Sequence, residues 1–401
     1  MMSSALEGLT VLDFTRLLPG PLATLHFADH GARVVKVEDL ARGDYARQDM
    51  AFGVSMSHLF HMVNRGKRSI AIDARNEAGR DAIRHLVAQA DVVVENFRPG
   101  TMDRLGLGYA DLSAVKPDLV YCSISAYGAR SPRAHMAAHD INMCAIAGVS
   151  DQLGAAGGAP SLSNFQIADI AGGGLGAVNA ILTALFQRER TGRGAYLDVS
   201  MTDVILGHNV MPTATGKTFH REAPRGGDML TGALACYGYY QTQDDRWLAV
   251  GALEPQFWRR LCEALDRPDL IPRHLSAGDA ADDLRATLAD IFRTKPLADW
   301  TAVFDETDCC VTAVLTPNEA AAEGRANGTV VDFEDPEDGS IRHHVGSTAA
   351  HGGPQGSQFV VRPAPRHGAD THDVLEEFGV DPDEVQALEA AGAIKPERAS
   401  A

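Results

Sequence analysis

The first 125 residues alternate strand-like and helix-like segments, and this alternation limits the fold more than any other feature of the sequence. Apolar, often β-branched runs occupy 9–14, 33–38, 69–73, 91–97 and 118–128. The segment 19–31 between two of them begins with Pro and ends with Gly, as helices often do. Strands that alternate with helices of this length form βαβ units, so we expect an α/β fold with a mainly parallel sheet. Ligands of such sheets bind beyond the carboxyl ends of the strands.

The second half of the chain has a different pattern. A long helix rich in small residues is expected from Asp169 to about Arg190, and a further strand at 196–201. Near residue 215 the pattern changes to a loop, then to two short strands around the turn residues Asp244 and Asp245, followed by helical segments. We therefore expect a large domain over 1–224, a smaller α+β domain over 225–330, and a connecting arm with two short C-terminal helices over 331–401.

Charge narrows the classes of ligand. The chain has 36 basic and 53 acidic residues and a net charge of −17, which disfavours non-specific binding to nucleic acid or to a membrane surface. An anionic ligand would need a local basic cluster, because the chain as a whole repels it. Candidates for this cluster are Arg65, Lys67, Arg68, Arg98 and Arg104, and the alternative is that they are solvated loop charges.

Cysteine usage and the termini indicate the compartment. The six cysteines form no CxxC pair, which is typical of reduced thiols rather than of a disulfide or zinc framework. The N-terminus lacks the features of a signal peptide, and no run of about 18 apolar residues is present. We expect a cytoplasmic protein with no metal site, no nucleic-acid partner and no membrane partner.

Three positions carry side chains suited to acid–base chemistry. His139 stands next to Asp140 at an expected helix start, where an imidazole can act as a base and a backbone N–H can stabilise an oxyanion. Asp169 precedes the run Gly172–Gly174, which costs helix stability, and this cost is explained if something must lie close against the backbone there. Glu254 stands at a strand-to-helix junction. Each of the three also has a plainer interpretation as a helix cap.

Familiar motifs of other enzyme classes are missing from the sequence. No GxGxxG stands between a strand and a helix, which argues against a dinucleotide-binding fold in the strict sense. No GxSxG or HExxH is present, so the sequence gives little support to a hydrolase function.

Ordered segments along nearly the whole chain resemble one family. They are LEGLTVLDFTRLLPGPLATLHFADHGARVVKVE, NRGKRSIAIDAR, DVVVENFRPGTMDRLGLGY, LVYCSISAYG, ADIAGGG and VLEEFGV. In these the chain resembles the class III CoA-transferase superfamily, which includes formyl-CoA transferases and 2-methylacyl-CoA racemases. The resemblance implies a Rossmann-like large domain built from both chain ends, a smaller α+β domain and an interlocked homodimer. It also implies an acyl-CoA thioester as substrate, with coenzyme A as part of it and no prosthetic group.

The resemblance also implies where coenzyme A lies. Many relatives have an arginine after the acidic residue of the second strand, where this chain has Asp39, so Arg42, Arg47 or Lys36 is left to supply the positive charge. The residues that the resemblance and this substitution assign to coenzyme A are Lys36, Ile72, Asp73, Ala74, Arg75, Asn96, Phe97, Arg98, Arg104 and Ala138.

The choice between a transferase and a racemase depends on the acid–base candidates rather than on the residues assigned to coenzyme A. Transferases of this superfamily use the aspartate that matches Asp169 as a nucleophile and form an aspartyl-CoA thioester. Racemases carry a His-Asp-Ile-Asn segment, which this chain has from His139, although Ala138 and Met143 replace the usual Gly and Tyr. The segment GALEPQFW is similar to the racemase segment that holds a third carboxylate, here Glu254.

Chemistry favours the racemase. Epimerising the carbon beside a thioester needs a base on one face, an acid on the other and a donor for the enolate oxygen. His139 and Asp169 provide the two groups, the backbone N–H of Asp140 the donor, and Glu254 can orient His139. A transferase needs only the aspartate. We therefore expect a racemase that interconverts R and S 2-methylacyl-CoA, with a CoA-transferase acting through Asp169 as the alternative and a non-catalytic acyl-CoA-binding protein as a lesser alternative.

Overall fold

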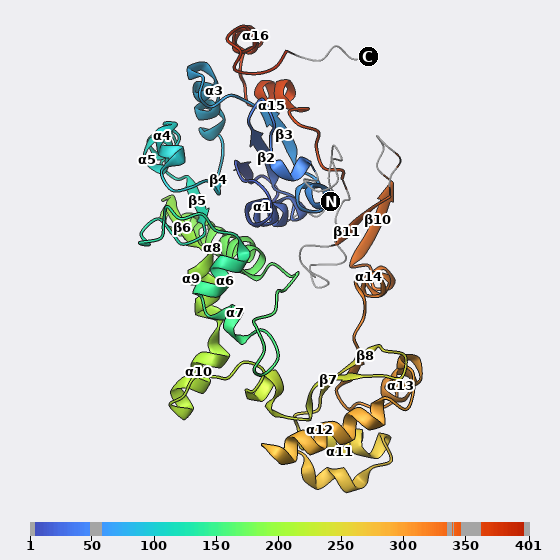
Figure 1. Cartoon of the computed structure of the whole chain (residues 1–401). Helices are drawn as coiled ribbons and strands as arrows, with labels where there is room; N and C mark the ends of the chain where they lie inside the picture. The colour runs from blue at the N-terminus through green and yellow to red at the C-terminus, as the bar shows by residue number, and fades with distance from the viewer. Residues whose placement is uncertain (1–4, 49–57, 335–338, 340, 346–361, 397–401) are drawn as a thin grey trace. The chain divides into compact units, whose positions relative to one another are not determined.

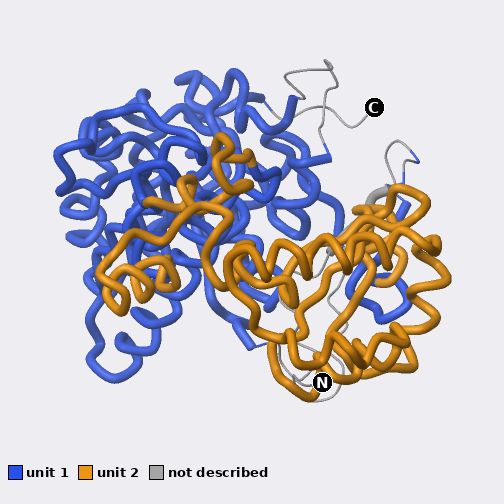
Figure 2. Tube along the Cα trace, turned by 60° about the horizontal axis from the view of Figure 1, so that its bottom comes forward, with its two compact units in different colours: residues 1–147, 163–208, 324–401 blue, residues 148–162, 209–323 orange. Residues whose placement is uncertain are grey.

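The computed structural model describes residues 5–48, 58–334, 339, 341–345 and 362–396 (Figure 1). The chain divides into two compact units, coloured separately in Figure 2. Unit 1 contains 1–147, 163–208 and 324–401, and unit 2 contains 148–162 and 209–323. The bounds differ from those expected from the sequence, because unit 2 begins at Asn209 rather than at 225 and takes in the segment 148–162.

Unit 1 is built on a six-stranded parallel sheet with the strand order β3-β2-β1-β4-β5-β6. This is the strand order of the Rossmann fold, with its reversal between β1 and β4. The expected α/β class and the expected Rossmann-like large domain are confirmed. The strands are β1 Thr10–Asp13, β2 Arg33–Glu38, β3 Arg68–Ala71, β4 Val92–Glu95, β5 Val120–Ser125 and β6 Ala195–Ser200.

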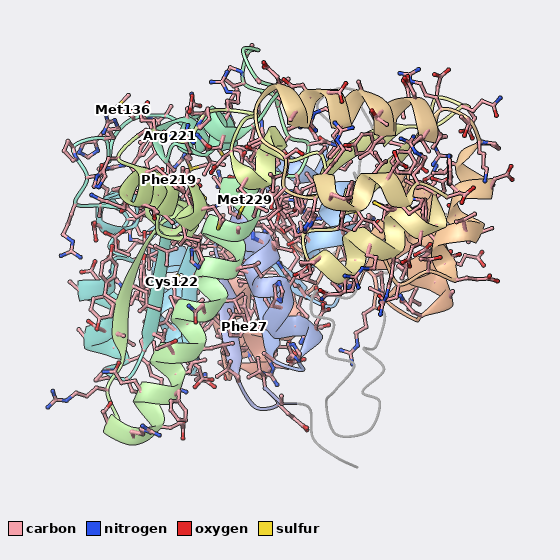
Figure 3. All side chains as sticks on the ribbon, turned by 90° about the horizontal axis from the view of Figure 1, so that it is seen from below. Phe27, Cys122, Met136, Phe219, Arg221 and Met229 are labelled. Carbon is pink, nitrogen blue, oxygen red and sulfur yellow. The ribbon has the colours of Figure 1, made fainter. Side chains whose placement is uncertain are left out.

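The central strands are buried on both faces, as a parallel sheet covered by helices requires. All four residues of β4 and all six of β5 are buried, and the three consecutive valines of β4 suit this position. Phe27 and Cys122 lie inside the packed interior of the unit (Figure 3). The helices of unit 1 are α1 Pro19–Asp29, α2 His58–Asn64, α3 Glu77–Val87, α4 Thr101–Arg104, α5 Tyr109–Val115, α6 Asp140–Ile146, α8 Gly176–Thr191, α9 Met201–His208, α15 Thr371–Glu377 and α16 Pro382–Ala390, with a 3₁₀ turn η1 at Tyr45–Arg47 and a π-helix η2 at Ala168–Leu175.

The two ends of the chain meet in unit 1. Helix α15 covers the edge strand β3, where Asp370 accepts a hydrogen bond from the Ser69 N–H at 2.8 Å and the Thr371 hydroxyl accepts one from the Ala71 N–H at 3.1 Å. These contacts satisfy backbone groups that an edge strand otherwise leaves open. Helix α14 Pro317–Ala326 spans the boundary between the two units, which falls after Glu323. The segment expected to be a connecting arm begins with an antiparallel strand pair, β10 Val330–Glu334 and β11 Ile341–Val345.

Unit 2 is a small α+β unit, as the sequence pattern indicates. Its sheet has the order β7-β8-β9, formed by Tyr237–Gln241, Trp247–Gly251 and Val311–Ala313. Asp245 has a φ of 57° in the turn between the first two strands, a conformation that Asp tolerates better than most residues. The helices are α7 Val149–Gln152, α10 Val210–Phe219, η3 Met229–Ala233, α11 Pro255–Ala264, η4 Pro268–Arg273, α12 Asp279–Phe292 and α13 Leu297–Asp305. Helices α11, α12 and α13 contribute an aromatic core of Trp258, Phe292, Trp300 and Phe304.

One helical stretch of unit 1 is unusually apolar. Ala168–Thr191 is long and apolar enough to cross a membrane, by length and composition only. Within the chain, 33% of its most apolar window is buried. Leu182 and Phe186 on α8 are 41% and 61% exposed. The unit therefore presents an apolar helix face that its own packing does not cover.

Candidate active site

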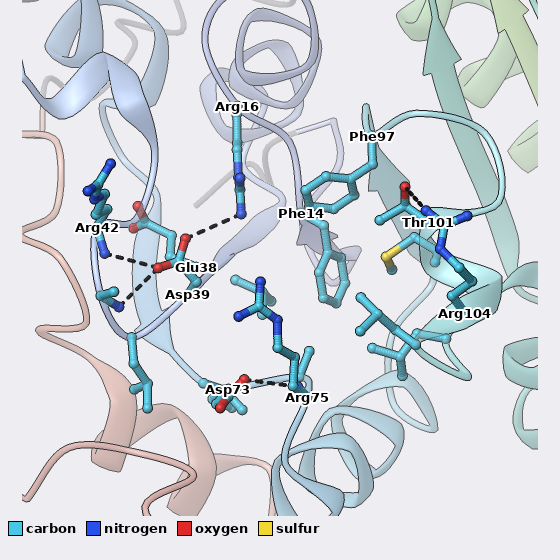
Figure 4. Close-up of a pocket in the computed structure, with 18 of the residues that line it drawn as sticks. Phe14, Arg16, Glu38, Asp39, Arg42, Asp73, Arg75, Phe97, Thr101 and Arg104 are labelled. Atoms are coloured by element: carbon cyan, nitrogen blue, oxygen red, sulfur yellow. Dashed lines mark hydrogen bonds and ion pairs between the residues drawn. The ribbon is translucent and has the colours of Figure 1, made fainter. Parts of the chain in front are cut away.

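A pocket of about 540 Å³ lies at the carboxyl ends of β1, β2, β3 and β4 (Figure 4). Ligands of open parallel sheets bind at this edge, near the point where the strand order reverses. The lining residues follow the ends of these strands or come from the loops and short helices after them: Phe14, Arg16, Val37 to Arg42, Tyr45, Ile72 to Arg75, Phe97, Thr101, Met102, Arg104, Leu105 and Leu107.

Four arginines contribute to the lining: Arg16, Arg42, Arg75 and Arg104. Within the described part of the chain, the guanidinium groups of Arg42 and Arg75 have no carboxylate partner. Arg104 donates to the Thr101 hydroxyl at 3.0 Å. Arginine suits phosphate binding because its planar fork donates two parallel hydrogen bonds. This acidic chain therefore has a local basic cluster, as its charge requires of an anion-binding protein.

Arg16 is a pocket residue that the sequence reasoning missed. Its backbone is held by Asn96, whose Oδ1 accepts from the Arg16 N–H and whose Nδ2 donates to the Arg16 carbonyl, each at 2.9 Å. The guanidinium stacks between Tyr45 and Phe97, at 5.2 and 4.9 Å from the ring centroids, and lies 3.3 Å from Asp39. Arg16 follows the first strand closely, and residues after the ends of the neighbouring strands line the same pocket. This position in the sequence is the signal that could have identified it.

A cluster of six buried charged residues lies beside the pocket: Asp13, Lys36, Glu38, Asp44, Arg47 and Lys67, named here the buried ionic cluster. Lys36 lies 2.9 Å from Asp44, and Lys67 lies 3.0 Å from Asp13. Burial opposes ionisation of Asp13, but the charges of Lys67 and Lys36 outweigh it and hold its pKa far below the usual range. Burial also opposes ionisation of Glu38, yet the hydrogen bonds and charge of Arg47 lower its pKa to about 2.

This cluster corrects the assignment of Lys36. The Lys36 side chain is fully buried and donates to the Thr15 carbonyl at 2.7 Å, so the prediction that it binds coenzyme A is wrong. Arg47 is likewise committed, because it binds both oxygens of Glu38. Of the three cations considered as replacements at Asp39, Arg42 lines the pocket. Asp39 itself accepts hydrogen bonds from the N–H groups of Ala41 and Arg42, each at 2.9 Å.

The basic segment at 65–68 is also structural. Arg65 pairs with Asp29 at 2.5 Å, Lys67 with Asp13, and Arg68 with Glu377 at 2.6 Å. None of these three side chains lines the pocket. The observed role is neither anion binding nor solvated loop charge, because each cation has a carboxylate partner within unit 1.

The other residues assigned to coenzyme A divide into two groups. Asn96 holds the backbone of Arg16, Arg98 is exposed, and Ala138 precedes α6, and none of the three lines the pocket. Six of the assigned residues do line it: Ile72, Asp73, Ala74, Arg75, Phe97 and Arg104.

The acid–base candidates of unit 1 stand after β5, at the same edge of the sheet. His139 is the residue before α6 and its side chain is exposed, whereas Asp140 opens the helix and is buried. The first N–H groups of a helix have no partner within it, so the Asp140 N–H is free of intrahelical bonding. The Asp140 Oδ1 accepts hydrogen bonds from the N–H groups of Ala168 and Asp169 at 2.6 and 3.0 Å.

Asp169 is half-buried in the first turn of η2, and its environment favours the protonated form. Burial, reinforced by the negative charge of Asp140, raises its pKa to about 6, and the positive charge of His139 acts in the opposite direction. A carboxyl group that titrates near neutral pH can both give and take a proton. His139, Asp140 and Asp169 are called the acid–base site below.

The glycines after Asp169 are explained by helix packing. A Cβ on Gly172 would lie 2.6 Å from the Met201 carbonyl oxygen of α9, and one on Gly173 would lie 2.6 Å from the Pro19 Cβ of α1. Close approach to the backbone was expected, and the approaching groups are neighbouring helices of the protein. These contacts set η2 tightly against α1 and α9, and so fix where Asp169 stands.

Glu254 belongs to unit 2, where it is the exposed residue immediately before α11. Its proposed contact with His139 stays a prediction. Among the described residues, no group of three or more His, Cys, Asp or Glu side chains is arranged to hold a metal ion.

A comparison with protein families matches residues 6–371 to the model described as CoA-transferase family III. The chain is 34% identical over 402 residues to the alpha-methylacyl-CoA racemase of Homo sapiens, covering 99% of both chains. It is 35% identical over 325 residues to the acetyl-CoA:oxalate CoA-transferase of Acetobacter aceti, covering 79% of this chain and 82% of that one.

A solved structure has the same fold. The crystal structure of a CAIB/BAIF family protein from Brucella suis is 28% identical, with a TM-score of 0.80 over 94% of this chain and 100% of that chain. The similarity therefore extends over both units of the chain.

Proposed function

The chain belongs to CoA-transferase family III, and from this premise we propose that it is an alpha-methylacyl-CoA racemase that interconverts the R and S forms of 2-methylacyl-CoA. Members of the family are enzymes that act on CoA thioesters without a prosthetic group. The finer choice of activity depends on the acid–base site.

The observation that carries the proposal is the environment of Asp169. Its pKa is raised to about 6, and the charge of His139 acts on it, so two different proton-transferring groups lie within electrostatic reach of each other. A racemase needs such a pair, because one group removes the α-proton and the other returns a proton to the opposite face. A carboxylate nucleophile, by contrast, acts in the ionised form, and a raised pKa lowers the fraction of that form at a given pH.

The remaining parts of the reaction follow from the same edge of the sheet. We assign the phosphates of coenzyme A to Arg16, Arg42, Arg75 and Arg104, which line the pocket. As the α-proton leaves, negative charge builds on the thioester oxygen, and the Asp140 N–H at the start of α6 is suited to donate to it. Either His139 or Asp169 then protonates the enolate, and the face that is used decides the stereochemistry.

A second candidate is a CoA-transferase, favoured by the 35% identity to the acetyl-CoA:oxalate enzyme. In that reaction Asp169 attacks the thioester carbonyl and CoA leaves as the thiolate, giving a mixed anhydride at Asp169. The thiolate then attacks the aspartyl carbonyl of the anhydride and releases the donor acid, leaving an aspartyl-CoA thioester. The acceptor carboxylate attacks this thioester and releases CoA again, and the CoA takes the acyl group from the new anhydride.

The deciding experiment incubates a chiral 2-methylacyl-CoA with the protein in deuterated water and follows the α-proton by NMR, with no second acid present. The expected result is that the α-proton signal disappears and that the substrate also loses its enantiomeric purity. If no exchange occurs but hydroxylamine traps an acyl-CoA-dependent adduct at Asp169, the protein is a transferase. Binding of acyl-CoA without exchange or trapping would leave only a binding protein.

We also propose that two copies associate, since the apolar face of α8 is uncovered within the chain. Large exposed apolar faces mark protein–protein interfaces. Light scattering after size-exclusion chromatography is expected to give twice the chain mass of 42.7 kDa. A mass of one chain at micromolar concentration would contradict it.

A further inference from the structure

The side chain of Asp140 connects the two helices that carry the acid–base site. Its Oδ1 receives two N–H groups from the first turn of η2, those of Ala168 and Asp169. Its Oδ2 lies 3.4 Å from the Sγ of Cys144, one turn further along α6. N–H groups in a first helical turn have no partner within their own helix, so Asp140 supplies it from the neighbouring helix.

We propose that the Asp140 carboxylate is a positioning residue, which holds the backbone of Asp169 with one oxygen and places a negative charge beside its side chain, while the Cys144 thiol fixes the other oxygen. This proposal rests on the proposed function and deepens it. It assigns a task to the Asp140 side chain in addition to the task of its backbone N–H.

The charged neighbours of Asp169 come from α6. Asp140 disfavours its ionised form, and His139 favours it. Helices α1 and α9 approach the glycines of η2 with the apolar groups of Pro19, Leu22 and Met201. The charge of Asp140 is therefore the local electrostatic influence that keeps Asp169 partly protonated near neutral pH, in addition to burial.

Cys144 fits the part of a donor. Burial, and then the adjacent charge of Asp140, raise the pKa of its thiol to about 11. The thiol therefore keeps its proton at neutral pH and can donate it to the carboxylate. A thiol is a weak donor, so Cys144 serves to orient the carboxylate more than to stabilise it.

The substitution Asp140→Asn separates the two tasks of the carboxylate. The amide oxygen still accepts both N–H groups, but the negative charge is gone. Asp140→Ala removes both. Titration of the carboxyl carbons by ¹³C NMR on aspartate-labelled protein reports the protonation of Asp169 directly, and its signal is assigned by its absence in Asp169→Asn.

In Asp140→Asn the titration midpoint of Asp169 is expected to fall by about one pH unit, because a like charge at close range has been removed. An unchanged midpoint in a variant with wild-type circular dichroism would overturn the proposal. This readout needs no turnover, so it judges Asp140 even if the wild type exchanges no α-proton and the racemase proposal fails.

Cys144 is tested by a matched pair of substitutions. Cys144→Ala removes the donor and is expected to slow α-proton exchange about three- to tenfold, the effect of one lost hydrogen bond. Cys144→Ser retains a donor and is expected to keep the wild-type rate. Equal rates in the alanine variant and the wild type would overturn the assignment of Cys144.

Discussion

Two regions at the same edge of the sheet use buried carboxylates in opposite ways. In the buried ionic cluster, Asp13 and Glu38 have cations within hydrogen-bond distance, and their pKa values are lowered. In the acid–base site, Asp169 has another carboxylate as its close neighbour, and its pKa is raised to about 6. One region holds its charges permanently, whereas the other keeps a proton exchangeable.

The difference shows that the partner decides what a buried aspartate does. A cation at 3 Å outweighs the cost of burial and makes the carboxylate a permanently charged structural element of the interior beside the pocket. A carboxylate neighbour adds to that cost and leaves a group that can transfer protons near neutral pH. Substitutions that neutralise one charge in each region should therefore have opposite effects on stability.

The largest effect is expected for Asp169→Asn. Loss of one of two proton-transferring groups should lower the rate of α-proton exchange by about a thousandfold, the range of general acid–base catalysis. The dissociation constant of coenzyme A, measured by calorimetry, should stay unchanged because the pocket arginines are intact. His139→Ala should behave in the same way, and near-native exchange in both variants would contradict the two-base mechanism.

The next effect concerns the buried ionic cluster. Lys67→Met should lower the free energy of unfolding by about 3–5 kcal/mol, because it leaves the buried Asp13 carboxylate short of a cation. Urea denaturation followed by circular dichroism measures it. The control is Arg42→Met, which removes an exposed cation and should change stability little. A Lys67 variant as stable as the control would show that the cluster is not tightly coupled.

Removing a charge from the acid–base site should change the free energy of unfolding in the opposite direction. Because the pKa of Asp169 is higher in the folded than in the unfolded chain, its contribution to stability falls as pH rises from about 4 to about 6. Asp169→Asn removes this loss and should stabilise the protein at pH 7 by about 1–2 kcal/mol. Denaturation at pH 4 and pH 7 tests the sign, and a gain that is larger at pH 4 would refute it.

The smallest effects are expected at the pocket arginines. Arg104→Ala and Arg42→Ala should each weaken coenzyme A binding about tenfold, roughly the contribution of one charge-assisted hydrogen bond. Arg98→Ala, an exposed residue outside the pocket lining, is the matched control and should leave affinity unchanged. If Arg98 proves as important as Arg104, the pocket in Figure 4 is not where the phosphates bind.

The sequence contains enough to predict much of this site. The resemblance to the family assigns Ile72 to Arg75, Phe97 and Arg104 to coenzyme A, and all of them line the pocket. The pocket lies at the carboxyl ends of parallel strands, where the strand-end rule expects a ligand. His139, Asp140 and Asp169 were found by residue type and by resemblance to a family. Arg16 was missed although the same rule applies to it.

Other features could not be predicted from the sequence because they depend on contacts between residues that are distant in sequence. Lys36 and Arg47 look like available cations until the fold brings Asp44 and Glu38 against them. The segment 148–162 reads as part of the large domain, yet it packs in unit 2. The glycines after Asp169 suggest a close ligand, whereas α1 and α9 occupy that space.

The sequence alone therefore determined the βαβ order, the strand ends at which function gathers and the family, since these depend on local periodicity and ordered motifs. Tertiary structure decided which charges are free and which are paired. A side chain's charge state depends on its burial and on the sign of the nearest charge, and neither quantity is local in sequence. Arg42 and Lys36 carry the same charge six residues apart, and their surroundings alone make one a pocket residue and the other part of the interior.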